Sequence, residues 1–381
     1  MKATLQEVED VRHQIEVLRG EATRAIDPDS IPCREISSPD QLCPEPLVSV
    51  AMITYNHARF IRAGIEGVVR QQTSFPFELV IGEDCSTDET RAIVLEYQQR
   101  YPQIIRVLVS DANVGATSNA LRTLIRCRGK YLAHCEGDDY WCDPEKLALQ
   151  AEVLERRPEV GLVYTDGIMK LHDGTMLDQR LRFLPGRRLF DQLLVDGYIL
   201  TCSEMHRASI IQQAIACNPL FRLELALGDV IHELASLRDA EAHCIERQMV
   251  VYVQNLSSVS NAVGAGCRAM RDGAVVRYWY ALHTPGREHL QKPLLRAVIV
   301  QQIYWAVHAP VRGAVRRRML AYAWRLAGEK RIRLSGLIWV RIGFGYLGMY
   351  GVLQGGLRLA KWCGLFRQRR AGHSGNEISF Q

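Results

Sequence analysis

The sequence lacks the signals that mark metal–thiolate sites, secretion and repeat folds. Its 11 cysteines form no C-x-x-C pair and show no Cys/His spacing of a zinc site, so a reduced, cytoplasmic environment is expected. The first residues, MKATLQEVEDVRHQ, carry charges where a signal peptide has an apolar run, and we expect no secretion signal. No internal repeat or low-complexity segment stands out. The 48% hydrophobic and 23% charged composition argues against a largely disordered chain.

Acidic residues are scarce in the C-terminal part of the chain. From Gln291 onward roughly 16 Lys/Arg face two acids, so the net charge of +5 conceals a negative remainder. A negative main domain argues against nucleic acid as its partner, whereas the basic tail indicates an anionic surface. Residues 335–357 are largely apolar and aromatic with basic flanks. We expect them to attach to a membrane interface rather than to span the bilayer, or else to pack on the main domain.

The chain is predicted to have four parts. Residues 1–26 should form one amphipathic helix, because apolar residues alternate at spacings of three and four at Leu5, Val8, Val11, Ile15 and Leu18. This helix either packs on its own domain or forms a dimerisation seam, for which it has few repeats. Residues 27–46, rich in proline and polar turn formers, look like a linker. A larger α/β domain is placed at 47–260 and a helical, basic region at 261–381.

From Leu47 onward, apolar runs of strand length alternate with helical stretches. The helices are expected near 59–71, from about Asp88, near 116–126 and at 144–156, and the strands are LVSVAMITY, FELVIGED, IIRVLVS, KYLAHCEGDD and VGLVYTD. This alternation predicts the α/β class, with a mostly parallel sheet covered by helices on both faces. The segment Ser86-Thr87-Asp88-Glu89 has the spacing of a capping box, which supports a helix start there.

Polar residues close three of the expected strands. They are Thr54-Tyr55-Asn56, Glu83-Asp84-Cys85-Ser86 and Glu136-Gly137-Asp138-Asp139. In parallel sheets ligands bind beyond the carboxyl ends of the strands, so these segments could line one crevice. Carboxylates there can accept hydrogen bonds from a base and from ribose hydroxyls, while one of them shares a divalent ion with a diphosphate. The alternative for any single strand end is an ordinary turn or helix cap.

Four acids lie within residues 136–143. Repulsion between neighbouring carboxylates favours a bound cation or a shifted pKa over an idle turn. Mg²⁺ or Mn²⁺ is the expected occupant, because both take oxygen ligands and accept substrate phosphates to complete the coordination shell. The cluster therefore predicts a divalent metal site.

The order of these motifs closely resembles glycosyltransferase family 2, with its GT-A nucleotide-binding fold. The resemblance is strong over residues 45–170 and weaker over 195–260, and it rests on VSVAMITYN, VIGEDCSTDET, NVGATSNALR, YLAHCEGDDYW and VGLVYTD. It implies an inverting, metal-assisted glycosyltransferase whose donor is a nucleotide-diphosphate sugar. On this interpretation residues 47–260 are the catalytic domain.

The resemblance also implies roles for residues at the first two strand ends. Thr54, Tyr55 and Asn56 match the segment that lies against the nucleotide. Glu83 and Asp84 match the acidic pair that reads the base. All five are therefore expected to bind the donor.

The family's D-x-D motif falls on Glu136-Gly137-Asp138. The resemblance implies a ribose contact for Glu136 and the metal for Asp138. Because the first acid is Glu here, the division of labour among Glu136, Asp138 and Asp139 stays open, and Asp139 is kept among the donor-binding residues. Tyr140 and Trp141 could stack on a base or sugar, but aromatic residues after an acidic turn more often pack beneath it.

Inverting members of the family use a later carboxylate as general base, and Gly228-Asp229 fits that place. From the residues alone, Asp229 is as readily a helix cap, but its place in the family makes it the expected catalytic base. His232, three positions on, is a rival base that could equally be a buried core residue. The acceptor-side strand is expected around Thr201 to Glu204.

The expected function is sugar transfer to a glycan or lipid-linked glycan in bacterial surface polysaccharide assembly, in the cytoplasm and peripherally on the inner face of its membrane. A sugar-1-phosphate nucleotidyltransferase is a rival, but its glycine-rich, Lys/Arg-bearing loop is missing from TYNHARF. A third alternative is an inactive glycan-binding or scaffold protein on the same fold. The sequence leaves the sugar, the acceptor and the oligomeric state open.

Overall fold

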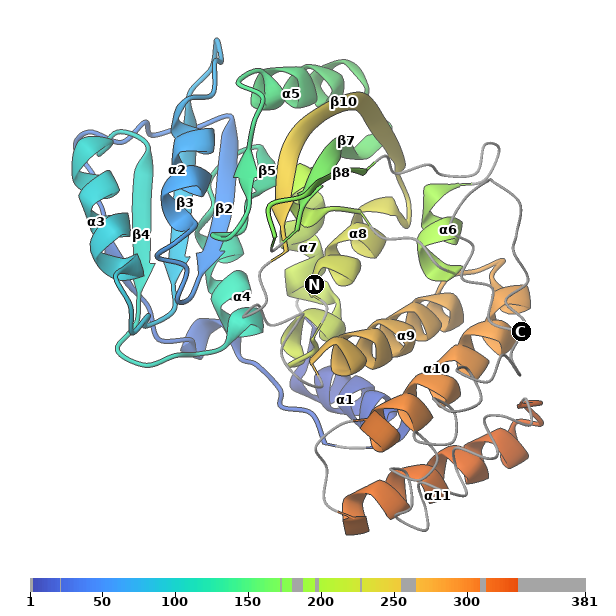
Figure 1. Cartoon of the computed structure of the whole chain (residues 1–381). Coiled ribbons are helices and arrows are strands. Elements are labelled where there is room, and N and C mark those ends of the chain that lie inside the picture. Colours follow the sequence, from blue (N-terminus) through green and yellow to red (C-terminus); the bar gives the residue numbers. More distant parts are fainter. Residues whose placement is uncertain are drawn as a thin grey trace.

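The computed structural model describes residues 3–20, 22–171, 173–179, 188–195, 199–226, 228–254, 265–308 and 313–334 (Figure 1). The strands are β1 Arg34–Ile36, β2 Val48–Thr54, β3 Phe77–Glu83, β4 Ile105–Val109, β5 Tyr131–His134, β6 Tyr140–Trp141, β7 Val160–Lys170, β8 Met176–Gln179, β9 Met205–Arg207 and β10 Glu241–Val253. The α-helices are α1 Leu5–Arg19, α2 Ile61–Val69, α3 Thr90–Arg100, α4 Ala116–Arg126, α5 Lys146–Arg156, α6 Leu189–Val195, α7 Ala208–Cys217, α8 Gly228–Leu237, α9 Ala265–His283, α10 Glu288–His308 and α11 Gly313–Glu329.

The strands form one sheet in the order β1-β4-β3-β2-β5-β9-β7-β10-β6, with β8 paired to β7. The adjacent strands β4, β3, β2 and β5 are parallel, and β10 is parallel to β7. The short β9 joins the two groups by pairing antiparallel with both β5 and β7. The predicted α/β class with a mostly parallel central sheet is therefore confirmed.

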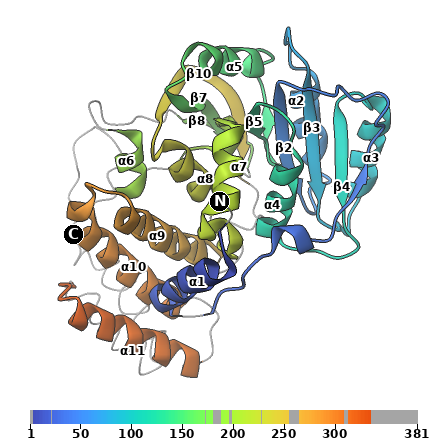
Figure 2. The ribbon, with the colours of Figure 1, turned by 180° about the vertical axis from the view of Figure 1, so that it is seen from behind.

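The parallel strands are buried on both faces, which explains their unbroken apolar runs. Along β2, Val50 and Met52 join a core with α2 and α3, whereas Ala51 faces a second core with α4. Figures 1 and 2, seen from opposite sides, place α2 and α3 on one face of the sheet and α4 on the other. Helices thus cover both faces, as the sequence predicts.

Two glycines let α2 lie directly on residues 136–141, which begin with the acidic segment Glu136 to Asp139. A Cβ at Gly64 would lie 2.9 Å from the carbonyl oxygen of Asp139, and one at Gly67 would lie 2.7 Å from that of Trp141. Both obstructing atoms belong to the backbone, so neither can move without shifting the segment. The close contact helps fix the backbone that carries Glu136 to Asp139.

We expect Gly67→Ala to destabilise the fold by about 1–3 kcal/mol, because the added methyl group overlaps the Trp141 backbone. The intrinsic helix preference for Ala, roughly 1 kcal/mol, would offset part of this cost. Urea unfolding midpoints measure the effect. Gly328→Ala in α11 is the matched control, since a Cβ there meets nothing within 4 Å. Equal midpoints for Gly67→Ala and the wild type would show that the segment yields freely.

The N-terminal helix packs on the C-terminal helices. Val8, Val11 and Ile15 of α1 are buried, and α1 contacts α9 and α10. Arg19 at its end pairs with Asp272 of α9 at 3.0 Å, with both side chains almost fully buried. In the structure the apolar face of α1 thus packs on its own chain. In the described part of the chain, none of the helices is both long and apolar enough to cross a membrane.

Two local expectations differ from the structure. The predicted linker 27–46 contains β1, which pairs antiparallel with β4 at the sheet edge and ties Glu35 to Arg106 at 2.8 Å. The predicted capping box does not form, because α3 starts at Thr90 and its N-cap Glu89 makes no side-chain cap. Asp88 instead accepts from the backbone N–H groups of Thr90 and Ala58, so it joins two loops.

Candidate active site

Parallel pairing brings the three polar strand ends to one edge of the sheet. Thr54 lies opposite Glu83 in the register of β2 and β3, and the N–H of Asp84 donates to the Thr54 carbonyl at 3.1 Å. The N–H of Gly137 donates to the carbonyl of Ile53 at 3.0 Å. The segments after β2, β3 and β5 are therefore immediate neighbours.

Asn56 links the loops that follow β2 and β3. Its backbone has φ 55°, a left-handed conformation that Asn tolerates, and its N–H donates to Ser86 Oγ at 3.0 Å. Its Oδ1 accepts from the Thr87 N–H at 2.8 Å. Tyr55, by contrast, is 42% exposed and leaves an aromatic face open to a ligand. Asn56 therefore shapes the edge, and donor binding by Tyr55 stays a prediction.

Glu83 and Asp84 are both buried and hold protein groups. Glu83 accepts from the Ser86 N–H at 2.7 Å and pairs with Arg91. Asp84 accepts from the N–H groups of Val114 and Gly115, at 2.8 and 3.0 Å, at the start of α4. The acidic pair therefore fixes the rim of the edge, and a base would have to use the remaining lone pairs of these oxygens.

Gly137 gives the acidic segment its shape. A Cβ at this position would lie 2.6 Å from Thr54 Oγ1 and 2.9 Å from His57 Nδ1, so only glycine fits between them. Those two atoms, together with Glu136 Oε2, are buried and have no hydrogen-bond partner among the described residues. Polar atoms left this way are costly, so a ligand or ion that satisfied them would be stabilised at this place.

Three of the groups here could hold a metal ion together. Glu136, Asp139 and Cys202 offer ligand atoms within 4.8 Å of one another, and Asp139 also accepts from the Val253 N–H at 2.7 Å. Asp138 lies nearer the surface, with Oδ2 3.7 Å from His57 Nε2. The carboxylates fit a divalent ion with oxygen ligands. The geometry brings Glu136 and Asp139 together, and the role of Asp138 stays a prediction.

Burial perturbs the acids at this edge. Loss of hydration, followed by repulsion from Asp138 and Asp229, raises the pKa of Glu136 to about 8. Burial, followed by repulsion from Asp138 and Glu136, raises the pKa of Asp139 well above its usual value. A divalent cation would remove this penalty by compensating the negative charge.

Asp229 lies in the first turn of α8. Its negative charge contributes to the raised pKa of Glu136, so its carboxylate acts on the same edge of the sheet. Its Oδ1 accepts from the Val230 N–H at 2.9 Å, and Thr201 Oγ1 lies 3.5 Å from Oδ2. Burial raises its own pKa, which makes the carboxylate a stronger base. A segment from late in the chain thus supplies an acid close to the acidic segment after β5.

The profile described as "Glycosyl transferase family 2" matches residues 49–212, which span β2 to α7 and include every strand end described above. Residues 49–212 therefore match a glycosyl transferase family 2 domain. Asp229 lies beyond the matched residues, so its role rests on the local geometry and on the resemblance given earlier.

Relatives support this assignment. An uncharacterized protein of Mycobacterium tuberculosis is 40% identical over 173 residues, covering 45% of this chain and 50% of that protein. TuaG of Bacillus subtilis, named as a teichuronic acid biosynthesis glycosyltransferase, is 35% identical over 136 residues, covering 35% of this chain and 52% of TuaG. The matches thus span about half the length of these relatives.

The fold has a solved counterpart. TarS residues 1–349 of S. aureus, in complex with UDP-GlcNAc, superimposes with a TM-score of 0.57 at 17% identity, covering 81% of this chain and 92% of that one. At this level of identity the likeness concerns the fold. It confirms the GT-A architecture predicted from the order of the motifs.

Beneath the edge of the family 2 domain lies a layer of buried polar side chains. Glu204 and His206 are fully buried, and His206 Nε2 lies 2.9 Å from Glu204 Oε2. His232 stacks between the rings of His134 and Phe221, at centroid distances of 5.6 and 5.3 Å. Burial lowers the pKa of His232 to about 4, which favours the core interpretation of this residue over that of a base.

We expect Glu233→Gln to stabilise the protein increasingly as the pH rises. Burial and repulsion from Asp229 raise the pKa of Glu233 from 4.5 to about 8. Below pH 4.5 the protonated carboxyl group makes its full contribution to the stability of the folded state. This contribution is lost as the pH rises toward 8, because ionising the group in the buried site costs free energy. The difference in melting temperature between variant and wild type should grow across this window. Glu45→Gln, at an exposed position, should show no such trend. A difference independent of pH would contradict the assignment.

Several residues of the site have no motif of their own. Lys146 is fully buried, donates to Gln150 Oε1 at 2.8 Å and lies 4.1 Å from the Trp141 ring centroid. The indole N–H of Trp141 donates to the Cys202 carbonyl at 2.8 Å, so Trp141 packs beneath the acidic segment, as predicted. His57 follows the Asn56 turn, and this position is the one signal that could have placed it at the edge.

Proposed function

We propose that this protein is an inverting glycosyltransferase that moves a sugar from a nucleotide-diphosphate sugar to a hydroxyl of a glycan or lipid-linked glycan. The observation that carries the proposal is the edge where the ends of β2, β3 and β5 meet: it joins an exposed Tyr55 and orphaned polar atoms to an acidic cluster. Asp229 adds a separate acid from α8. A donor site and a base on different elements are what an inverting transfer requires.

In the proposed mechanism, residues of the edge hold the donor and Asp229 activates the acceptor. Tyr55 and the loops fixed by Asn56 contact the nucleotide, with Thr54, Glu83 and Asp84 framing it and Glu136 directed at the ribose. Asp138 and Asp139 lie on the diphosphate side, where bound Mg²⁺ or Mn²⁺ supplies positive charge. Asp229 removes the proton from the acceptor hydroxyl as that oxygen attacks the anomeric carbon from the opposite face. The product has inverted configuration.

The relatives suggest the substrate classes. TarS binds UDP-GlcNAc, and TuaG is named for teichuronic acid biosynthesis. We infer a uridine-type donor and an acceptor among bacterial surface polysaccharides. Specificity for the sugar depends on loop contacts that differ between such enzymes.

The proposal is tested by screening the full chain with UDP-, GDP- and TDP-sugars in Mn²⁺. A true donor should raise the melting temperature, since a ligand that binds only the folded state stabilises it. Turnover should then release a nucleoside diphosphate. Release of pyrophosphate from a sugar phosphate and a nucleoside triphosphate would favour the nucleotidyltransferase, and donor binding without turnover would favour an inactive scaffold.

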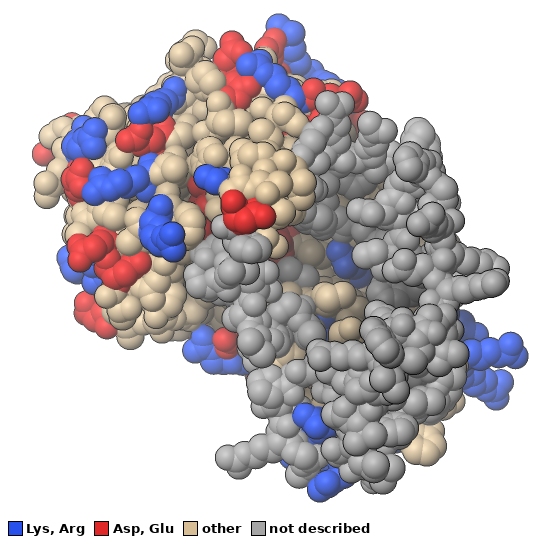
Figure 3. Space-filling model, in the orientation of Figure 1, with Lys and Arg blue, Asp and Glu red and all other residues tan. Residues whose placement is uncertain are grey.

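We further infer a cytoplasmic location on the inner face of the membrane. The support is the basic C-terminal charge: where α10 and α11 lie in the lower part of Figure 3, the charged atoms in view are blue, whereas acids and bases mix over α2 to α5. The apolar segment 335–357 lies outside the described residues. Basic side chains near a surface add about 1 kcal/mol each to binding of anionic lipid.

Deleting residues 335–381 should abolish co-sedimentation with anionic liposomes and leave donor binding intact. The full chain should sediment with phosphatidylserine-containing liposomes and not with neutral ones, because the attraction is electrostatic. Raising the salt concentration should weaken the sedimentation. Unchanged sedimentation after the deletion, or none with the full chain, would remove the membrane from the proposal.

A further inference from the structure

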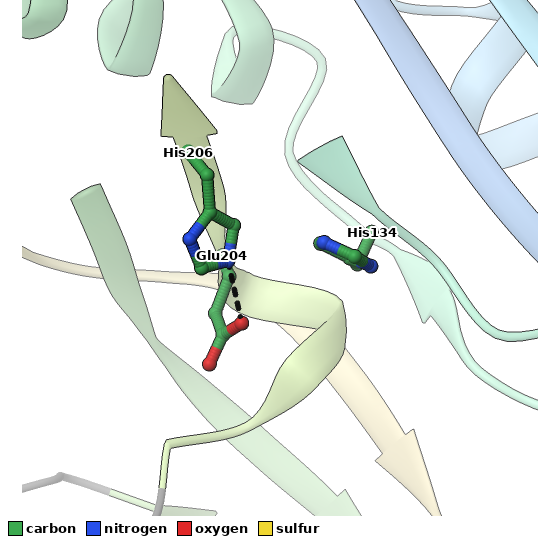
Figure 4. A group of neighbouring side chains, drawn as sticks. All are labelled: His134, Glu204 and His206. Carbon is green, nitrogen blue, oxygen red and sulfur yellow. Dashed lines mark hydrogen bonds and ion pairs between the residues drawn. The ribbon is translucent and has the colours of Figure 1, made fainter. Parts of the chain in front are cut away.

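Two histidines and a carboxylate converge in the layer beneath the catalytic edge. His134 ends β5, Glu204 precedes β9 and His206 lies within β9. Their ligand atoms all lie within 4.8 Å of one another. Figure 4 shows Glu204 and His206 joined by a hydrogen bond, with a ring nitrogen of His134 pointing toward them from the neighbouring strand. His134 and His206 lie on the paired strands β5 and β9, and Glu204 comes directly before β9, so the sheet sets their spacing.

Two polar atoms of this group make no hydrogen bond within the described part of the chain. His134 Nε2 and Glu204 Oε1 are buried without a hydrogen-bond partner among the described residues. The nearby ammonium of Lys146 donates to Gln150 and lies over Trp141. An orphaned imidazole nitrogen and an orphaned carboxylate oxygen in a dry interior are each costly, and a bound cation would satisfy both.

The third side chain is already oriented as a metal ligand. Ser236 Oγ of α8 lies 2.8 Å from His206 Nδ1, which leaves Nε2 directed at Glu204. Metal-bound histidines commonly have their second nitrogen held in this way, because the partner fixes the ring and its tautomer. The hydrogen bond between His206 and Glu204 is where the ion would insert.

From this arrangement we propose that His134, Glu204 and His206 bind a Zn²⁺-class divalent ion at a site separate from the acidic edge. Two neutral imidazoles and one carboxylate suit Zn²⁺ and leave a fourth position for water or another oxygen. Tetrahedral bonds of about 2.0–2.1 Å place ligand atoms roughly 3.3 Å apart, so His134 moves slightly inward on binding. Because the site is buried, the ion enters as the chain folds.

A bound ion would help to fix the position of α8, the helix that carries the proposed base Asp229. His206 contacts Ser236, and burial, followed by the charge of Glu233, raises the pKa of Glu204. Ser236 and Glu233 both lie on α8, which carries Asp229 in its first turn. Cross-linking β5 to β9 would therefore hold α8 at a fixed position under the edge. This assigns the ion a structural task that does not depend on the identity of the donor.

The test is the metal content of the full chain after expression with Zn²⁺ and dialysis. We expect about one equivalent in the wild type and in Asp138→Asn, which removes an acid of the catalytic edge. His206→Gln should lose the ion. His232→Gln is the matched control, because it changes a buried histidine beside His134 that is not in the group.

Cobalt gives a second readout that needs no variant. Wild-type protein refolded with Co²⁺ should show the intense visible absorption of a tetrahedral Co²⁺ site, and Glu204→Gln should reduce it if His206→Gln fails to fold. Wild type that retains no zinc and shows no such absorption would overturn the proposal, as would zinc retained in His206→Gln. Zinc lost in Asp138→Asn would place the ion at the catalytic edge instead. None of these outcomes depends on whether the protein transfers sugar.

Discussion

Asp229→Asn should lower kcat by about two orders of magnitude or more while donor affinity persists. The amide keeps the shape of the side chain but cannot accept the proton of the acceptor hydroxyl. Asp229 is suited to this task because burial raises its pKa and because it lies on α8, apart from the acids after β5. Donor affinity comes from calorimetric titration and kcat from release of nucleoside diphosphate.

The matched control is Asp239→Asn, which changes an exposed acid just beyond the same helix. It should leave both kcat and affinity unchanged. Near wild-type turnover for Asp229→Asn would move the base to Glu233 or His232. Burial raises the pKa of Glu233 to about 8, whereas His232 is stacked between two rings, so Glu233 would be tested first.

The sequence predicts the nucleotide-binding part of the fold because its signals there are local. Apolar runs of strand length and intervening helices appear at β2, β3, β4 and β5 close to where they were expected. Parallel pairing then places their polar ends together without further information. For this reason Thr54, Glu83 and Glu136 could be grouped at one edge from sequence alone.

Contacts between distant segments could not be predicted in the same way. Nothing in the sequence near Asp84 indicates that its carboxylate accepts a hydrogen bond from a backbone N–H group just before α4, thirty residues later in the chain. Strand β1 is too short to stand out in a proline-rich segment, and it forms because β4 offers a free edge. No rule of residue spacing predicts the group of His134, Glu204 and His206, because β5 and β9 come together only in the folded sheet.

The sequence alone also could not distinguish the roles of Glu136, Asp138 and Asp139. A motif of the form E-G-D-D assigns the metal to Asp138 by resemblance. The structure adds that Glu136 and Asp139 converge with Cys202, while Asp138 lies beside His57 nearer the surface. The structure therefore offers two candidate ligand sets for a divalent ion, one centred on Asp138 and one on the buried pair.

Asp138→Asn should weaken Mn²⁺-dependent donor binding by at least roughly tenfold, because loss of even a supporting contact at a metal site commonly costs 10–100-fold in affinity. Removing Mn²⁺ with a chelator should abolish the difference between variant and wild type, since the carboxylate acts through the ion. Calorimetric titration of the donor with Mn²⁺ and with chelator measures both. Asp40→Asn, at an exposed position away from the motif, is the control.

Glu136→Gln and Asp139→Asn extend this experiment to the buried pair. Neutralising Glu136 removes a carboxylate whose pKa burial raises to about 8, so the variant should fold at least as well as the wild type at neutral pH. A metal-dependent loss in all three variants would mean that the acids share the ion. Full Mn²⁺-dependent affinity in Asp138→Asn, combined with its loss in Asp139→Asn, would contradict the assignment of Asp138. The ion would then belong to the group formed by Glu136, Asp139 and Cys202, and Asp138 would act through His57 at the mouth of the site.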